Sequence, residues 1–72
     1  MSKLSERIKS TRIQHKTTQK QLADAIEVQA ASVQRFEYGT VRPSLDKLIA
    51  IADYFDVSLD YLVGRSDDPA RH

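Results

Sequence analysis

The amino-acid sequence predicts an all-α domain built from five short helices. Apolar residues recur at three- and four-residue spacing along most of the chain, which is the period of amphipathic helices. Hydroxyl residues of the kind that cap helix N-termini precede three of these stretches, at Thr18, Ser44 and Ser58. The 72 residues include no cysteine, so helix packing has to hold this single domain without disulfides or cysteine-based zinc sites.

The first helix is expected to begin near residues 2–4 and to end near His15. Leu4 and Ile8 would face inward, with Lys3, Arg7 and Lys9 in water. Arg12 falls on the same side as Ile8, one turn later. Because a buried unpaired charge is costly, this arginine needs a partner from elsewhere in the chain.

Residues 18–39 predict two further helices separated by about three residues, which is the spacing of a helix-turn-helix. The first should cover residues 19–26, with Thr18 and Gln21 forming a capping box at its start. The second should cover residues 30–38 and end at Gly39 in the left-handed conformation. The outward side of this second helix is polar, slim and basic, and consists of Ala31, Gln34, Arg35 and Tyr38.

Ser44 is expected to cap a helix over residues 45–55, and Ser58 a short last helix that stops at Gly64. Helical spacing predicts that the longer helix covers the back of the two preceding ones through Leu45, Leu48, Ile49, Ala52 and Phe55, with Ile51 and Tyr54 at the edge of that stripe. The sequence therefore divides into a domain over residues 1–64 and a polar stretch over residues 65–72, expected to be a flexible tail or the start of a linker.

The net charge is only +1, but it is unevenly distributed. Residues 1–42 hold eight Lys and Arg against four Asp and Glu, whereas residues 43–72 hold three against six. Such a division suggests one face for phosphates and another for something else, and ordinary solvated helix faces explain it equally well. The apolar runs are too short for a membrane span and no signal peptide opens the chain, which favours a soluble cytoplasmic protein.

Several short motifs occur in order and at characteristic spacing, namely Thr18-Gln19 with Leu22-Ala23, Phe36-Glu37 followed by Gly39, Pro43-Ser44, Ile51-Ala52 and Val57-Ser58-Leu59. Together they resemble the Cro-like phage-repressor helix-turn-helix family, also called the XRE family. The resemblance covers residues 4–64. Three positions depart from the family, because glycine is usual there at Lys16 and Glu27, and leucine at Thr17.

That resemblance implies sequence-specific binding of double-stranded DNA as a transcriptional regulator, most simply a repressor. It assigns Arg12 and Glu37 to a structural ion pair; the alternative is two exposed charges that never meet. The implied base-reading residues are Gln29, Ala30, Ala31, Gln34 and Arg35. The implied phosphate contacts are Gln19 first, then Thr18, Lys20, Tyr38, Thr40 and Arg42. For Tyr38 a ring lying over the loop, and for Lys20 a plain solvated lysine, are the alternatives.

One short recognition helix reaches few base pairs, so a homodimer on a palindromic operator is expected, forming only on DNA if its interface is small. The interface should lie away from the basic half, and Tyr54, Tyr61 and Val63 are the expected contacts. The rival interpretation is a helical protein-interaction module, such as an antitoxin whose main partner is a protein. No nucleophile with a neighbouring base and no ligand-spaced histidines occur, so neither an enzyme, a small-molecule substrate, a cofactor nor a metal is expected.

Overall fold

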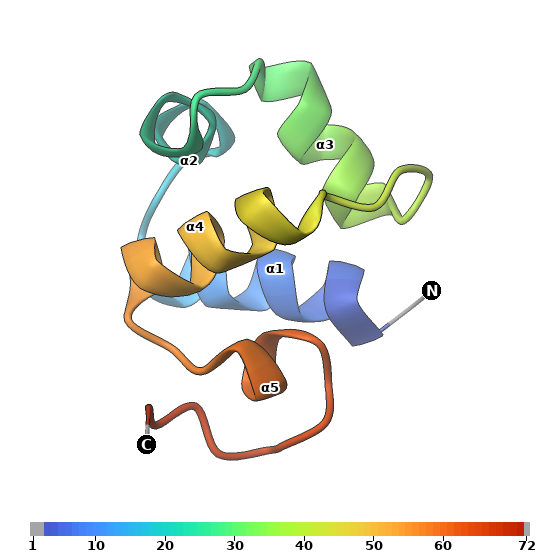
Figure 1. Cartoon of the computed structure of the whole chain (residues 1–72). Helices are drawn as coiled ribbons and strands as arrows, with labels where there is room; N and C mark the ends of the chain where they lie inside the picture. Colours follow the sequence, from blue (N-terminus) through green and yellow to red (C-terminus); the bar gives the residue numbers. More distant parts are fainter. Residues whose placement is uncertain (1–2, 72) are drawn as a thin grey trace.

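The computed structural model describes residues 3–71, and five helices follow one another along them (Figure 1). No strand occurs in that part of the chain, so the predicted all-α fold is confirmed. The range expected for the start of the first helix included residue 2, which lies outside the described residues. The helices are α1 (Lys3–Gln14), α2 (Gln19–Ile26), α3 (Ala30–Tyr38), α4 (Leu45–Phe55) and α5 (Leu59–Leu62).

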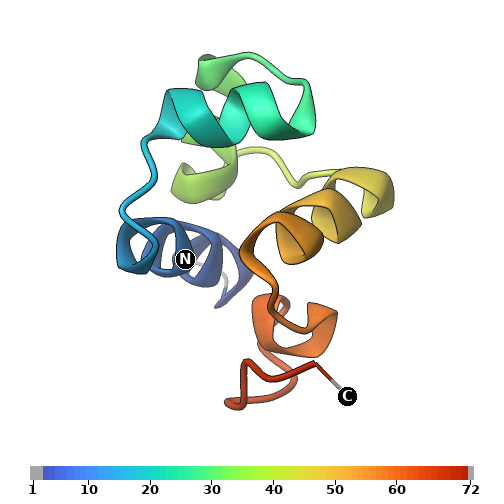
Figure 2. The same ribbon diagram turned by 90° about the vertical axis from the view of Figure 1, so that its left-hand side faces the viewer.

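The helices are arranged so that the domain has two different ends. α2 and α3 form one end, and α5 with the residues after it forms the opposite end, as Figure 1 and Figure 2 both show. α1 and α4 lie between the two ends and contact each other as well as α5. The segment with helix-turn-helix spacing is therefore presented at one extremity of the molecule, on a support made by α1 and α4.

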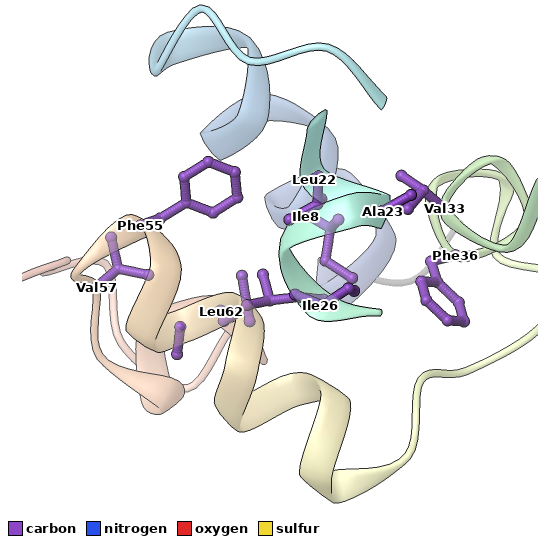
Figure 3. Close-up of a cluster of buried hydrophobic side chains, with 11 residues drawn as sticks. Ile8, Leu22, Ala23, Ile26, Val33, Phe36, Phe55, Val57 and Leu62 are labelled. Atoms are coloured by element: carbon purple, nitrogen blue, oxygen red, sulfur yellow. The ribbon is translucent and has the colours of Figure 1, made fainter. Parts of the chain in front are cut away.

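A single core joins all five helices. Each helix contributes one side chain with 0% exposed surface, namely Ile8, Leu22, Val33, Ile51 and Leu62. Phenylalanine rings from α3 and α4 extend this cluster at its two sides (Figure 3). Ala23 is also buried and lies beside Val33, so its small side chain lets α2 and α3 pack closely.

The inward face of α4 differs from the one that its sequence predicts. Leu45 is 64% exposed and Ile49 is 42% exposed, so neither covers the back of the other helices. Ile51, expected at the edge, is fully buried instead. The helix buries a stripe rotated by about an eighth of a turn from the expected one, because α1, α2 and α5 all contact it from that side. That stripe consists of Leu48, Ile51, Ala52 and Phe55.

The helix ends follow their local sequence signals. The Thr18 hydroxyl accepts a hydrogen bond from the Gln21 amide at 3.0 Å, and the Gln21 side chain accepts one from the Thr18 amide at 2.8 Å. The Ser44 and Ser58 hydroxyls cap α4 and α5 by accepting hydrogen bonds from the amides of Lys47 and Tyr61, and neither cap has the reciprocal side-chain bond within the described residues. α2 also receives help from α4, since the Lys47 ammonium donates to the Ile26 carbonyl at 2.7 Å and places a positive charge at the C-terminus of α2.

Glu27 ends α2 in the left-handed conformation, with φ 61° and ψ 49°. A side chain in this region costs about 1 kcal/mol, which glycine avoids at the expense of greater backbone entropy in the unfolded chain. We expect Glu27→Gly to raise the free energy of unfolding slightly, by no more than about 1 kcal/mol, in a urea titration. Asp24→Gly, inside the same helix, is the matched control and should lower it by about 1 kcal/mol. A destabilised Glu27→Gly would show that the Glu27 side chain outweighs its backbone strain.

The stretch expected to be a flexible tail takes a defined course in the structure. The Arg7 guanidinium donates to the carbonyls of Tyr61 and Ser66, both at 3.0 Å, and to the Asp67 carboxylate at 2.8 Å. The Ser58 amide donates to the Pro69 carbonyl at 2.9 Å. Arg71 forms ion pairs with Asp53 and Asp56 of α4 and its C-cap. These contacts are polar and come from residues distant in sequence, so the polar composition of the segment gives no sign of them.

Candidate nucleic-acid interface

The outward face of α3 is exposed at the helix-turn-helix end of the molecule. Val33, Phe36 and Glu37 turn into the domain, so the other side of the helix faces solvent. Gln29 precedes the helix in an extended conformation, and its side chain caps no backbone amide. This leaves the start of α3 and its polar outward side chains available to a ligand.

The predicted base-reading residues do not all lie equally far outward. Gln29, Ala31, Gln34 and Arg35 are exposed, whereas Ala30 is half-buried against the core. Among residues 3–71, no side chain forms an ion pair or hydrogen bond with the guanidinium of Arg35. Arg35 therefore carries a positive charge on this face that is not neutralised within the domain.

The predicted phosphate-contacting residues lie at three places: the start of α2, the end of α3 with the residues after it, and a separate groove. Thr18, Gln19 and Lys20 lie at the start of α2, where Thr18 is engaged in the capping box and Lys20 is 3.4 Å from Asp24. Tyr38 is 77% exposed, so its ring is not buried beneath the loop that follows α3. Thr40 donates to the Arg35 carbonyl. Arg42 lies apart from the others, in a groove formed with Lys3, Leu4, Pro43, Leu48 and Val63.

A shallow hollow of about 370 Å³ joins α1, α2 and α3 at this surface. Lys9 of α1 lines it, although the sequence analysis predicts only a solvated side chain for Lys9. Its position in the sequence indicates more, because Lys9 stands three residues before Arg12 and so lies on the same side of α1. The lining residues are Lys9, Gln19, Gln34, Glu37 and Tyr38.

Arg12 and Glu37 form the ion pair that the resemblance assigns to them. The Arg12 Nε atom lies 2.6 Å from Glu37 Oε2, and Nη2 lies 3.1 Å from Oε1. The side chains are 13% and 4% exposed, so the pair is largely removed from water. Arg12 also donates to the Thr17 carbonyl at 2.9 Å, which ties the loop before α2 to α1 and α3.

The part of the chain that the structure describes contains neither a metal-binding cluster nor a membrane-spanning helix. No group of three or more His, Cys, Asp or Glu side chains within residues 3–71 is placed to hold a metal ion. None of the helices there has the length and apolar character needed to cross a membrane.

Two helices joined by three residues, the second presenting a polar and basic face to solvent, define a helix-turn-helix domain. The helix-turn-helix family model matches residues 8–62, and the chain belongs to this family. The resemblance to Cro-like, XRE-type members is confirmed as well, since a phage repressor is among its relatives.

Two curated relatives cover most of this chain. The uncharacterized HTH-type transcriptional regulator YobD of Bacillus subtilis is 41% identical over 89% of this chain and 57% of its own length. The cryptic phage CTXphi transcriptional repressor RstR of Vibrio cholerae is 36% identical over 88% of this chain and 56% of its own length. This chain thus spans little more than half the length of the curated relatives it matches.

Solved structures show the same fold. The P22 c2 repressor protein, in complex with a synthetic operator, superposes with a TM-score of 0.82 at 25% identity, over 88% of this chain and 96% of that one. A transcriptional regulator from Listeria innocua gives a TM-score of 0.81 at 33% identity, over 85% of this chain and 57% of that one. The names of these relatives describe regulators and repressors, and none describes an enzyme.

Proposed function

We propose that this chain binds double-stranded DNA sequence-specifically through α3 and acts as a transcriptional repressor. The observation that carries the proposal is the outward face of α3, where Arg35 is exposed and unpaired among residues 3–71. The fold supports it, because the similar P22 c2 repressor was solved in complex with a synthetic operator. The proposal includes a cytoplasmic location, because a bacterial transcriptional regulator meets its DNA in the cytoplasm.

The chemistry of the exposed side chains suits the major groove. A helix in this groove presents its first residues to the base edges. Arg35 offers a two-pronged donor for guanine, Gln29 or Gln34 can pair with adenine, and the Ala31 methyl group can contact the thymine methyl. Ala30, the first residue of α3, is half-buried against the core. Its small side chain adds no bulk that would hold α3 away from the bases.

Selection of bound duplexes from a random pool, followed by a salt titration, tests this function. We expect an enriched sequence with palindromic character, and an affinity that falls steeply as salt rises because condensed counterions are released. A protein-interaction module such as an antitoxin, whose DNA binding is secondary, would dock on its protein partner mainly through apolar contacts, and that affinity would change little with salt. No enrichment at low salt would refute the proposal.

Arg35→Ala should weaken operator binding by about 1 to 3 kcal/mol and relax the preference at one base pair. Its side chain is exposed and forms no hydrogen bond or ion pair among the described residues, so thermal stability should stay nearly unchanged. The measurement is a set of binding titrations on the operator and on its single-base variants. Lys20→Ala is the matched control, since a phosphate contact weakens binding to all sequences alike. A uniform loss for Arg35→Ala would contradict base reading.

A homodimer on a palindromic operator is part of the proposal, and the three residues expected at its interface have different neighbours within the domain. The Arg7 guanidinium lies over the ring of Tyr61, with its Cζ atom 4.1 Å from the ring centroid. Val63 lines the groove that contains Arg42, whereas Tyr54 packs edge-on against Phe55 on another side of α4.

We place the contact between copies on the exposed side chains of Val41, Leu45 and Ile49, which are 45%, 64% and 42% exposed. Arg42 and Asp46 flank them, and a two-fold axis would bring these opposite charges of the two copies together. The domain measures 30 × 22 × 22 Å, so two copies side by side would separate their α3 helices by roughly one domain width. Half-sites one turn of DNA apart lie about 34 to 36 Å from each other, which is somewhat more than the longest extent of one domain.

Ile49→Lys should reduce the complex on a palindromic duplex from two protomers to one, as measured by sedimentation. A lysine near the two-fold axis meets the same charge on its partner and loses water without a counter-charge. Tyr54→Lys is the matched control, because Tyr54 is 48% exposed on the same helix and points elsewhere. Two-protomer binding by both Ile49→Lys and Leu45→Lys would place the interface on another surface.

A further inference from the structure

Glu37 connects three helices through one buried carboxylate. Its Oε1 atom accepts hydrogen bonds from Arg12 Nη2 and from Gln19 Nε2, both at 3.1 Å, while Oε2 accepts from Arg12 Nε. Glu37 belongs to α3, Arg12 to α1, and Gln19 is the first residue of α2. The carboxylate therefore holds the start of α2 directly against the helix that carries the proposed base-reading residues.

The contact with Glu37 restricts the Gln19 side chain without saturating it. A carboxamide has two N–H donors, and Glu37 accepts from only one of them. The other donor remains for a ligand in the hollow that Gln19 lines with Lys9 and Tyr38. The backbone amides of the first two residues of α2 have no acceptor inside the helix, so they add donors for an anion at the same place.

The charge of Glu37 would oppose a phosphate here if it stood alone. Arg12 makes two hydrogen bonds to it and cancels that charge inside the protein. A lysine in place of Gln19 would turn its ammonium toward the carboxylate, whereas a neutral carboxamide can bridge a carboxylate and a phosphate, using one N–H for each. The combination of Arg12, Glu37 and a glutamine thus suits an anion bound just outside the pair.

We propose that Glu37 is a positioning residue for DNA binding: it holds the Gln19 carboxamide so that its second N–H donates to a backbone phosphate, in fixed register with α3. This inference rests on the proposed function. The ion pair then has a consequence beyond stability, because it links the phosphate contact of α2 to the base contacts of α3 as one rigid unit.

A double-mutant cycle in DNA affinity tests the link, using Gln19→Ala in the wild type and in Arg12→Met/Glu37→Met. In the wild type, Gln19→Ala should weaken binding about tenfold, equally for operator and random duplex, as expected for a hydrogen bond to a charged group. The slope of affinity against salt should not change, because a neutral side chain releases no counterion. In the double variant the same substitution should weaken binding by less than about twofold.

Gln19→Asn provides a test that does not disturb the buried pair. It keeps the amide but is shorter by one methylene, so it cannot reach Glu37 and a phosphate together, and it should weaken binding as much as Gln19→Ala. In the free protein, one side-chain amide proton of Gln19 should show the shift of a hydrogen-bonded proton by NMR and lose it in Arg12→Met/Glu37→Met.

The outcomes separate this inference from the proposed function. Equal losses from Gln19→Ala in both backgrounds, or full affinity in Gln19→Asn, would overturn the positioning role while wild-type binding still supported DNA recognition. If Gln19→Ala leaves the DNA affinity of the wild type unchanged, the proposed phosphate contact of Gln19 is itself refuted. A wild type that binds no duplex at all would refute the proposed function.

Discussion

Replacing Glu37 alone with methionine should lower the free energy of unfolding by about 3 to 5 kcal/mol. The reason is that Arg12, whose side chain is only 13% exposed, keeps its charge without a partner after the change. Arg12→Met alone should be similarly severe, because it leaves Glu37 charged at 4% exposure. Replacing both residues should cost less than either single change, since the double variant buries no lone charge. Urea titrations of the four proteins give the coupling energy.

A control for this cycle exists on α2. Lys20 and Asp24 are also oppositely charged, but their side chains are 79% and 67% exposed. Removing either should change stability by no more than about 0.5 kcal/mol, as for other exposed pairs one helical turn apart. Additive losses at Arg12 and Glu37, with no coupling, would show that the two charges do not depend on each other.

Ile51→Ala should destabilise the domain by about 2 to 5 kcal/mol. Ile51 has 0% exposed surface in the shared core, so truncation leaves a cavity that the surrounding helices cannot fully close. Such a loss is a large fraction of the stability of a small domain, and partial unfolding at 37 °C is expected by circular dichroism.

Leu45→Ala is the matched control, because Leu45 lies on the same helix and is 64% exposed. It should change the free energy of unfolding by less than about 0.5 kcal/mol. The helical spacing of α4 alone predicts the reverse ranking. If Leu45→Ala lowers the free energy of unfolding more than Ile51→Ala does, then α4 packs through the face that its sequence predicts.

The helix boundaries were predictable because they depend on nearby atoms. The hydroxyls of Thr18, Ser44 and Ser58 each accept from an amide three residues later, so a short window of sequence contains the whole interaction. Gly39 likewise ends α3 through its own backbone conformation. The exception is Asp56, which ends α4 at φ 55° although sequence reasoning did not single it out; aspartate is one of the few residues that tolerate this region.

The parts that sequence did not predict depend on how helices meet. The spacing in α4 allows two overlapping apolar stripes, and only the positions of α1, α2 and α5 decide that Ile51 is buried and Ile49 is not. Lys9 borders the hollow because α1 lies beside the start of α2 and the C-terminal half of α3. The contact between Gln19 and Glu37 spans 18 residues and has no local signature.

The course of residues 65–71 has a practical consequence for measurements on this domain. Arg71 forms ion pairs with Asp53 and Asp56. Figure 1 and Figure 2 show that the segment after α5 lies on the side of the molecule away from α2 and α3. A fluorophore or biotin attached after the chain thus begins far from the face of α3. A protein tethered to a sensor chip in that orientation presents α3 to the flowing solution, and a dye there reports tumbling without touching the duplex.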